Sequence, residues 1–352
     1  MRRWLILGLL LVISGAAAAL AFARPVAVAA AGGRAIAAYR FFGSNWLLPL
    51  APRSAWLLPL PAGEVRLVAS GDTLATIAGS QVRVLRFGAG PGRPPTVASG
   101  NIGPERVQRA AAGDLDGDGS AELLLVRGEP AEPPPEGRPG LGGALEVWQL
   151  RDGGLQRAFR GLEKHTPWQA VAGDLDGDGK AELAVGTWGQ AAYDPRWAER
   201  PWVYRWKGGQ PFALWLGSRL AHPFADLTLL NLRQGEPAFL VATEATRDGG
   251  QALGIYRWTN DFGFTLAYTG PPWQRIHKVW PLPQQPGCAA LAALAEPGGL
   301  VLLTLPSSPE GSLVEMSRWP ATSAATAQVA SIPGRLWLLE DGELTTFVTC
   351  RS

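Results

Sequence analysis

Two short segments carry the side chains with the clearest chemistry in this sequence. The first holds Asp114, Asp116 and Asp118, followed by Gly119 and Glu122. Three carboxylates at positions 1, 3 and 5 of a loop repel one another unless a cation lies between them. Glycine at position 6 permits the sharp turn that wraps a chain around an ion, and Glu122 at position 9 can complete the oxygen shell. Hard oxygen donors without His or Cys favour Ca²⁺ over Zn²⁺ or copper.

The second segment repeats this pattern 60 positions later, from Asp174 to Glu182. Position 7 is Ser120 in one copy and Lys180 in the other, which suits a main-chain carbonyl ligand because the side chain is then free to vary. The alternative is an Asp- and Gly-rich surface turn that holds no ion. The sequence predicts two Ca²⁺ sites, with ligands from Asp114, Asp116, Asp118, Ser120, Glu122, Asp174, Asp176, Asp178, Lys180 and Glu182.

The elements that flank these loops are predicted to be strands. An EF-hand would need a Glu at position 12 and a helix on each side, but position 12 is Leu125 in one loop and Val185 in the other. The residues that follow Glu122 are apolar and strand-like, so each loop is expected to lie in a β-hairpin.

Alternating segments with an aromatic or apolar end recur six times, at residues 82–87, 145–148, 202–206, 254–258, 313–319 and 343–347. Alternation with period two is typical of half-buried strands. With the loop hairpin and an outer strand added, each unit holds four strands. The sequence therefore predicts an all-β chain that forms a β-propeller of six four-stranded blades, with seven blades as the alternative count. An open β-solenoid or a pair of sandwiches is the alternative architecture.

The last unit ends after its aromatic strand, so the ring needs one more strand. We expect residues 55–58, around Trp56, to supply it by pairing with the Phe347 strand, because closure removes exposed sheet edges. The expected organisation is a signal or anchor over residues 1–23, a linker that begins ring closure over residues 24–52, and a propeller over residues 53–352.

The two acidic segments resemble the FG-GAP and VCBS-type repeats of integrin-α-like propellers. The match covers residues 106–220, where the pattern D-x-D-G-D-G-x-x-E-L occurs twice. The resemblance implies that each loop joins the first and second strands of a blade and binds Ca²⁺, and it favours seven blades. Residues 231–235 and 281–285 occupy the same place in the next two units without the carboxylates, so those blades are expected to be metal-free.

The N-terminus reads as an export signal. Arg2 and Arg3 precede an uncharged segment rich in Leu and Ala, and residues 21–23 (Ala-Phe-Ala) fit a cleavage site. The alternative is an uncleaved membrane anchor, since residues 4–23 are just long enough to span a bilayer. We expect an exported protein, secreted or associated with the cell envelope.

Charge and cysteine content narrow the possible partners. The formal net charge is +2 and no basic block occurs, so nucleic-acid binding is not expected. The chain has two cysteines, Cys288 and Cys350. They form either a disulfide, which export permits, or two separate buried thiols, and the sequence leaves both open.

No catalytic motif is present: the sequence has no nucleophile elbow, P-loop, Rossmann glycine fingerprint or H-E-x-x-H helix. We therefore expect a non-enzymatic calcium-binding module for binding or adhesion at the cell surface, with a protein or glycan ligand. The alternative is a secreted propeller enzyme that acts on polysaccharide, which would need Arg, His and Tyr side chains to converge on the central funnel.

The expected ligand site lies on the face opposite the acidic loops. There the long connections between strands and between blades bring aromatic and histidine side chains, and such loops on a rigid scaffold commonly carry binding residues. The alternative is that the tryptophans only cap blade ends and the histidines are structural. The candidate ligand-binding residues are His165, Trp168, Trp188, Tyr193, Trp197 and His222.

Overall fold

The structure is a computed structural model that describes residues 24–31, 34–41, 44–49, 58–60, 66–70, 72–87, 96–128, 143–151, 154–217, 219–231, 236–259, 263–282, 288–306, 311–320, 327–332, 335–340 and 343–350. The predicted export segment, residues 1–23, and Trp56 lie outside these residues. Within the described ranges, no helix is long and apolar enough to cross a lipid bilayer.

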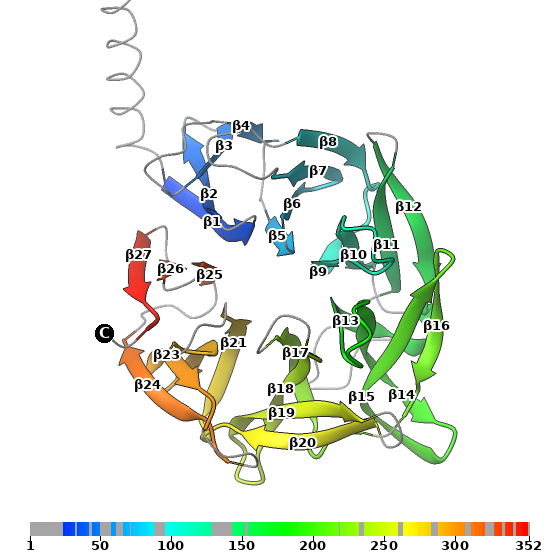
Figure 1. Cartoon of the computed structure of the whole chain (residues 1–352), viewed down its shortest axis with the longest axis vertical. Helices are drawn as coiled ribbons and strands as arrows, with labels where there is room; N and C mark the ends of the chain where they lie inside the picture. The colour runs from blue at the N-terminus through cyan, green and yellow to red at the C-terminus, as the bar shows by residue number, and fades with distance from the viewer. Residues whose placement is uncertain are drawn as a thin grey trace, which may run out of the picture.

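The described strands form seven antiparallel groups, each with its strands in chain order and each called a sheet here, arranged as a ring (Figure 1); the second and third groups are joined into one eight-stranded sheet. The first three sheets are β1 (Arg24–Ala31), β2 (Arg34–Phe41), β3 (Ser44–Pro49) and β4 (Leu58–Leu60); β5 (Arg66–Ser70), β6 (Thr73–Ala78), β7 (Gln81–Arg86) and β8 (Thr96–Asn101); and β9 (Val107–Gly113), β10 (Glu122–Arg127), β11 (Ala144–Arg151) and β12 (Gly154–Gly161). One parallel bridge, between Ser99 and Gly154, joins the second and third sheets at their outer strands.

The other four sheets complete the ring. They are β13 (Pro167–Gly173), β14 (Glu182–Ala191), β15 (Asp194–Lys207) and β16 (Gln210–Trp215); β17 (Phe224–Leu230), β18 (Phe239–Ala245), β19 (Gln251–Thr259) and β20 (Gly263–Thr269); β21 (Arg275–Pro281), β22 (Leu291–Glu296), β23 (Gly299–Thr304) and β24 (Val314–Trp319); and the three strands β25 (Gln328–Ile332), β26 (Arg335–Glu340) and β27 (Glu343–Val348). A 3-10 turn, η1 (Glu163–His165), precedes β13. The described chain is thus an all-β propeller, as predicted.

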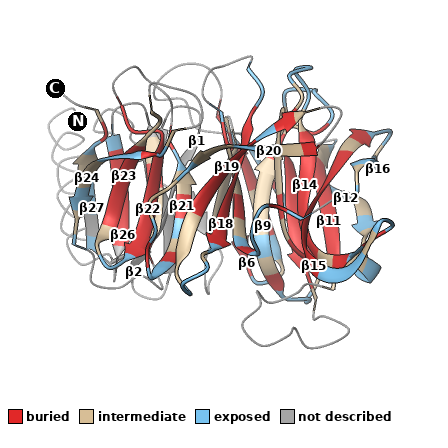
Figure 2. Cartoon of the chain, turned by 90° about the horizontal axis from the view of Figure 1, so that it is seen from below, coloured by how far each residue is buried: buried red, intermediate tan, exposed pale blue. Residues whose placement is uncertain are grey.

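The core lies between neighbouring sheets rather than inside any one of them. The second strands β6, β10 and β14 are buried along most or all of their length because both of their faces are covered (Figure 2). One apolar cluster, for example, joins Leu124 and Leu145 of the third sheet to Val185 and Trp202 of the fourth. Each sheet is therefore stabilised by its neighbours, as in other repeat folds.

Ring closure differs from the prediction. Residues 24–49, expected to be a linker, supply β1 to β3 of a complete first sheet, and β1 contacts both β5 and β25. The described strands therefore group into seven units, where six were predicted and seven was the alternative. The predicted pairing of residues 55–58 with the Phe347 strand falls mostly outside the described residues; of that segment, Leu58 belongs to β4, which pairs with β3, and β27 pairs with β26. The first sheet escaped notice because β1 is Ala-rich and shows little alternation.

The two cysteines are bonded to each other. Cys288 Sγ and Cys350 Sγ lie 2.01 Å apart, 62 positions apart in the sequence. The Ala289 N–H also donates to the Thr349 carbonyl at 2.8 Å. The disulfide joins the segment that leads into β22 to the segment after β27, so the last sheet is tied to its neighbour. The alternative of two separate thiols is wrong.

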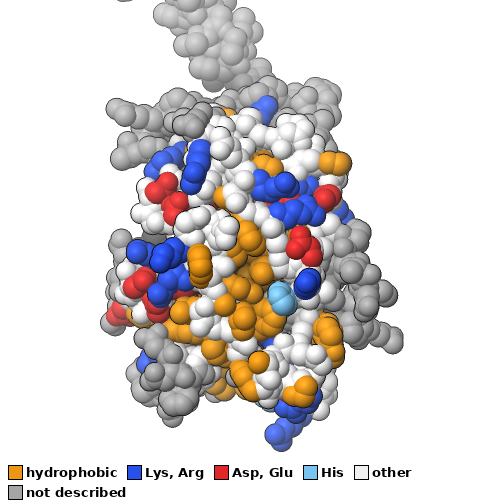
Figure 3. Space-filling view, turned by 90° about the vertical axis from the view of Figure 1, so that its right-hand side faces the viewer, with side chains coloured by type: hydrophobic (Ala, Val, Ile, Leu, Met, Phe, Trp, Pro, Cys, Tyr) orange, Lys and Arg blue, Asp and Glu red, His pale blue; other side chains and the backbone are white. Residues whose placement is uncertain are grey.

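The predicted aromatic strands fall mostly at the third position of a sheet, as β7, β11, β15, β19 and β27. The segment at residues 313–319 is instead β24, the outer strand of its sheet, because β23 precedes it. The outer strand β16 of the fourth sheet exposes Phe212 and Leu214. Hydrophobic side chains gather in a band on this side of the molecule, between charged groups (Figure 3).

Candidate functional site

Both acidic loops lie in hairpins between the first and second strands of a sheet, as predicted. The first connects β9 to β10, with Gly113 opposite Glu122, and the second connects β13 to β14, with Gly173 opposite Glu182. The two hairpins are neighbours in the ring because β9 packs against β13. A Cβ atom on Gly113 would lie 2.5 Å from the Ala172 Cβ, so the glycine permits this close approach.

The loop backbone turns around the first aspartate. Gly119 and Gly179 adopt φ angles of 82° and 84°, the left-handed region predicted for position 6. In the first loop, the Asp114 carboxylate accepts hydrogen bonds from Gly117 N at 2.9 Å and from Gly119 N at 2.9 Å. Asp174 does the same in the second loop, from Gly177 N at 2.6 Å and Gly179 N at 2.9 Å. The backbone thus converges on position 1 in both copies.

Three carboxylates converge in each loop. One oxygen each from Asp114, Asp116 and Glu122 lie within 4.8 Å of one another. Asp174, Asp176 and Glu182 form the matching group in the second loop. Calcium–oxygen distances of about 2.3–2.6 Å allow two ligands of one ion to lie at most about 5 Å apart. The spacing of both groups is therefore compatible with one shared calcium ion.

The glutamates at position 9 show what a cation would contribute. Both side chains are buried, and burial raises the pKa of Glu122 and of Glu182 to about 7. This net value also includes the nearby aspartate charges, which raise the pKa, and the hydrogen bonds from Leu115 N and Leu175 N, which lower it. Glu182 Oε1 is buried and accepts no hydrogen bond, with Arg205 Nε at 3.6 Å. Each glutamate therefore has a buried carboxylate whose charge a cation would stabilise.

The other predicted ligands, at positions 5 and 7 of each loop, do not belong to these three-carboxylate groups. Asp118 and Asp178 are exposed, and neither belongs to the three-carboxylate groups. Asp118 Oδ1 instead accepts from Ser120 N at 2.7 Å, and Asp178 Oδ1 from Lys180 N at 2.9 Å. For Ser120 and Lys180, the predicted ligand is the main-chain carbonyl, and that assignment stays a prediction.

The two loops differ in one neighbour that the sequence pattern did not reveal. Arg205 lies opposite Glu182 on β15, and its guanidinium contacts Asp176 and approaches Asp178 Oδ2 at 3.8 Å. The corresponding residue of the third sheet is Gln149, whose Nε2 donates to Asp116 Oδ2 at 3.0 Å. A guanidinium thus contacts an aspartate carboxylate of the second loop. In the first loop a neutral amide contacts Asp116, and the Arg86 guanidinium donates to the Gly119 carbonyl at 3.0 Å and to Ser120 Oγ at 2.9 Å.

The predicted ligand-face residues have separate environments. Trp168 is 1% exposed in the core between the fourth and fifth sheets, where a ligand cannot reach it, so its assignment is wrong. His165 packs against the Trp202 ring, with centroids 4.5 Å apart. Trp188 is partly buried and packs against the same core as Trp168. Trp197 and Tyr193, by contrast, are 57% and 65% exposed. Position in a loop did not distinguish a core tryptophan from an exposed one.

Tyr193, Trp197 and His222 line a pocket of about 480 Å³. It lies between the β14–β15 turn and the connection from β16 to β17 (residues 216–223). Because β14 runs from the second acidic loop to this turn, the pocket and the loop lie at opposite ends of the same strand. The structure thus gathers three of the six candidate residues at the end of the blade where the sequence predicted them.

An arginine cluster beside this pocket was not anticipated. Arg200 is fully buried and donates to the carbonyls of Gly189 at 2.9 Å and Arg196 at 2.9 Å. The Asp194 carboxylate pairs with Arg200, Arg196 and Arg219. These ion pairs lower the pKa of Asp194, with the hydrogen bond from Arg196 as the largest cause. The cluster fixes the β14–β15 turn.

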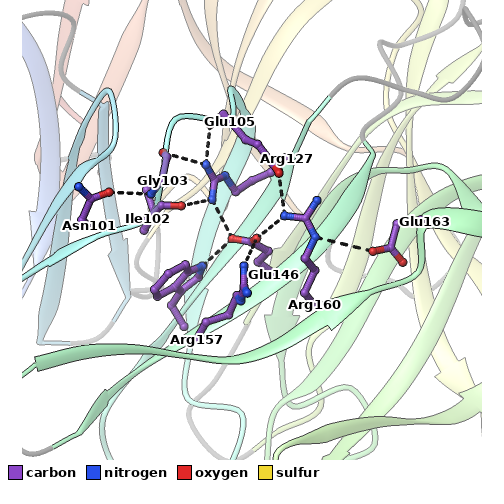
Figure 4. A network of polar contacts seen from close by, with 10 residues as sticks. Asn101, Ile102, Gly103, Glu105, Arg127, Glu146, Arg157, Arg160 and Glu163 are labelled. Carbon is purple, nitrogen blue, oxygen red and sulfur yellow. Dashed lines mark hydrogen bonds and ion pairs between the residues drawn. The ribbon is translucent and has the colours of Figure 1, made fainter.

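A second buried network lies in the third sheet and contacts the connection between β8 and β9. Arg127 and Glu146 are both buried and pair at 3.0 Å, and Arg160 and Trp148 also donate to the Glu146 carboxylate (Figure 4). Arg127 also donates to the carbonyl of Glu105 at 2.6 Å, in the connection between β8 and β9. This network anchors the segment that leads into the first acidic hairpin. Its charged residues lie within apolar strand patterns, which conceal such pairs from sequence reasoning.

Comparison with known proteins supports the fold. The FG-GAP repeat model matches residues 166–192, the segment that contains the second acidic loop. No curated protein matches the chain. Among solved structures, the WD40 domain of coronin from Toxoplasma gondii is similar, with a TM-score of 0.57 and 13% identity over 93% of this chain and 82% of that one.

Two further solved structures are also similar. The Dos1 propeller gives a TM-score of 0.51 with 11% identity, over 93% of this chain and 79% of that one. AztD from Citrobacter koseri gives a TM-score of 0.50 with 12% identity, over 94% of this chain and 85% of that one. At such identities these likenesses describe the fold alone.

Proposed function

We propose that this FG-GAP-type β-propeller is an exported, non-enzymatic module that binds two calcium ions and uses its opposite face for a protein or glycan ligand at the cell surface or envelope. Calcium would be held in the β9–β10 and β13–β14 loops. Its role is to neutralise the crowded carboxylates and to fix the two hairpins. The fold supplies the scaffold, and the function depends on these sites rather than on the fold.

The convergence of Asp174, Asp176 and Glu182 carries the calcium proposal. Glu182 Oε1 is buried without a hydrogen-bond donor and has only the more distant ion pair with Arg205 Nε at 3.6 Å, so a directly bound cation would stabilise it. The first loop offers the same three residue types in the same geometry. The separate FG-GAP match over residues 166–192 supports the same assignment.

A propeller enzyme that acts on polysaccharide remains the second candidate. Such an enzyme would need Arg, His and Tyr side chains to converge on the funnel. The inner strands bring Asp226 near Arg109 and Lys278, which influence its pKa, and Lys278 near Arg66. This group contains cations and one carboxylate, and His277 of the inner strand β21 contacts Glu296 at 2.7 Å. Release of reducing ends from a polysaccharide by the purified protein would favour the enzyme instead.

Thermal unfolding with and without calcium tests the proposal. Extracellular modules bind calcium with dissociation constants of about 10⁻⁴–10⁻³ M. At about 1 mM calcium, mass action then stabilises the fold by about 0.4–1.4 kcal/mol per site. We expect calcium to raise the melting temperature, Asp116→Ala to remove part of the rise, and Asp116→Ala with Asp176→Ala to remove all of it. If calcium raised the melting temperature of the double variant as much as that of the unaltered protein, the assignment would be contradicted.

A further inference from the structure

The pocket at the β14–β15 turn combines exposed aromatic rings with guanidinium groups. Its volume of about 480 Å³ suits a small ligand or one residue or two of a longer chain. We propose that this pocket binds a carboxylate-bearing saccharide. The inference rests on the ligand-binding function proposed above and specifies the ligand of that site.

The charge around the pocket carries the first part of the argument. Asp194 pairs with Arg196 Nε at 2.8 Å, Arg200 Nη2 at 3.1 Å and Arg219 Nε at 3.2 Å. The second acid that lines the pocket, Glu199, is buried. The lining thus holds two arginines, Arg196 and Arg219, and two acids, while Arg200 is fully buried behind it. An anion would therefore be bound by guanidinium donors that Asp194 leaves open rather than by an excess of positive charge.

The arginines differ in what they can still donate. The buried Arg200 is occupied by the carbonyls of Gly189, Gly217, Asp194 and Arg196. The side chains of Arg196 and Arg219 are 68% and 42% exposed, and each contacts Asp194 through Nε. Their terminal nitrogens therefore remain as donors toward a second acceptor. A guanidinium fork matches the two oxygens of a carboxylate, which makes the anion specific in shape as well as charge.

The aromatic rings supply the saccharide part of the argument. Trp197 and Tyr193 are both exposed at the pocket, and the Trp197 ring is supported by the Trp188 ring, with centroids 6.4 Å apart and planes at 31°. Flat, supported rings suit the apolar face of a sugar ring. The Trp197 ring and the guanidinium groups together fit an acidic sugar better than a small inorganic anion, because a small anion would contact only the arginines.

Calorimetry with matched probes tests the proposal. The probes are trigalacturonate, its fully methyl-esterified form, and glucose 6-phosphate, in calcium-free buffer because carboxylates can themselves bind calcium. We expect trigalacturonate to bind at least about tenfold more tightly than the ester, a difference of about 1.4 kcal/mol. Equal binding of acid and ester, binding of neither, or tighter binding of glucose 6-phosphate would overturn the proposal.

Variants locate the site. Arg219→Gln and Arg196→Gln should each weaken trigalacturonate binding at least fivefold and leave the ester unaffected, whereas Trp197→Ala should weaken both. Arg318→Gln, which alters an exposed ion pair with Glu315 in the sixth sheet, is the matched control and should change neither. Arg196 is exposed enough that its variant should fold even if Arg219→Gln does not. Unchanged affinity in both arginine variants would contradict the site.

Failure of this inference is separable from failure of the proposed function. Calcium binding is measured on the same variants at the opposite end of the blade, away from the pocket. A protein that binds calcium at both loops but no acidic saccharide would refute the inference and leave the calcium module intact.

Discussion

Arg205 and Gln149 occupy equivalent places beside the two acidic loops, and they make the loops unequal. The Arg205 guanidinium already contacts Asp176, so calcium at the second loop must displace or face a fixed cation. In the first loop Gln149 donates a neutral hydrogen bond to Asp116, and the Arg86 guanidinium contacts the Gly119 carbonyl and Ser120 Oγ instead of an aspartate carboxylate. The first loop should therefore bind calcium more tightly.

Substitution of each residue by the other tests this predicted difference in calcium affinity between the two loops. We expect Arg205→Gln to raise the calcium affinity of the second loop on the order of tenfold, because one unit of repulsion is removed near the ion. Gln149→Arg should lower the affinity of the first loop to a similar extent. Calcium titration of each variant, with Arg318→Gln as the control, reports both effects. Unchanged calcium affinities would mean that the Arg205 side chain leaves the loop when calcium binds, without a measurable free-energy penalty.

The Glu146 network makes a prediction about pH. Burial alone would raise the pKa of Glu146, but hydrogen bonds from Trp148 and Arg127 and the charge of Arg127 lower it overall. A carboxyl group with a lowered folded-state pKa stabilises the fold above its unfolded value of 4.5, and this contribution disappears as the pH falls through the folded-state value.

Glu146→Gln removes this charge and leaves the buried Arg127 unpaired, which should cost about 3 kcal/mol at pH 7. Denaturant unfolding should show this difference from the unaltered protein at pH 7. The difference should begin to shrink as the pH falls below 4.5, where the carboxyl group of the unfolded chain becomes protonated, and should be lost once the pH passes the lower folded-state pKa of Glu146. A difference that is independent of pH would mean that the network stabilises through shape alone.

At the scale of elements, the approach of β9 to β13 places the two acidic hairpins side by side. Gly113 makes this possible, since a Cβ there would lie 2.5 Å from the Ala172 Cβ. Gly113→Ala should therefore lower the free energy of unfolding by about 1–3 kcal/mol. Gly154→Ala is the control, because the nearest atom to its added Cβ is the Arg151 carbonyl oxygen at 3.8 Å. Equal effects of the two changes on chemical denaturation would contradict this account of the packing.

Elements with local sequence signals were predictable, and elements that depend on distant partners were not. The spacing of Asp114, Asp116 and Gly119 is enough to predict a loop in a hairpin, because the turn and the carboxylates are encoded within nine residues. The position of Arg205 opposite Glu182 depends on cross-strand register, which is set by a long hairpin whose length the sequence did not reveal. Trp168 was misplaced for a related reason, since its burial depends on Phe224 and other residues of the next sheet.

At the scale of the whole molecule, the ring is held by contact of β1 with β25 and by the disulfide between Cys288 and Cys350. A crosslink that closes a loop of this length restricts the unfolded chain by about 4 kcal/mol in the loop-entropy estimate. Cys288→Ser with Cys350→Ser should therefore lower the free energy of unfolding by up to about that amount. Denaturation of the double variant measures it, and reduction of the unaltered protein should reproduce the loss. A loss far below 1 kcal/mol would mean that the strands alone secure the seventh sheet.

The central claim is that this propeller holds two calcium ions in its two acidic loops. Isothermal titration of the calcium-free protein tests it most directly, with Asp116→Ala and Asp176→Ala as single-site variants. We predict two ions per chain, the tighter one lost in Asp116→Ala and the weaker one lost in Asp176→Ala. No binding, or one site that survives both substitutions, would contradict the account.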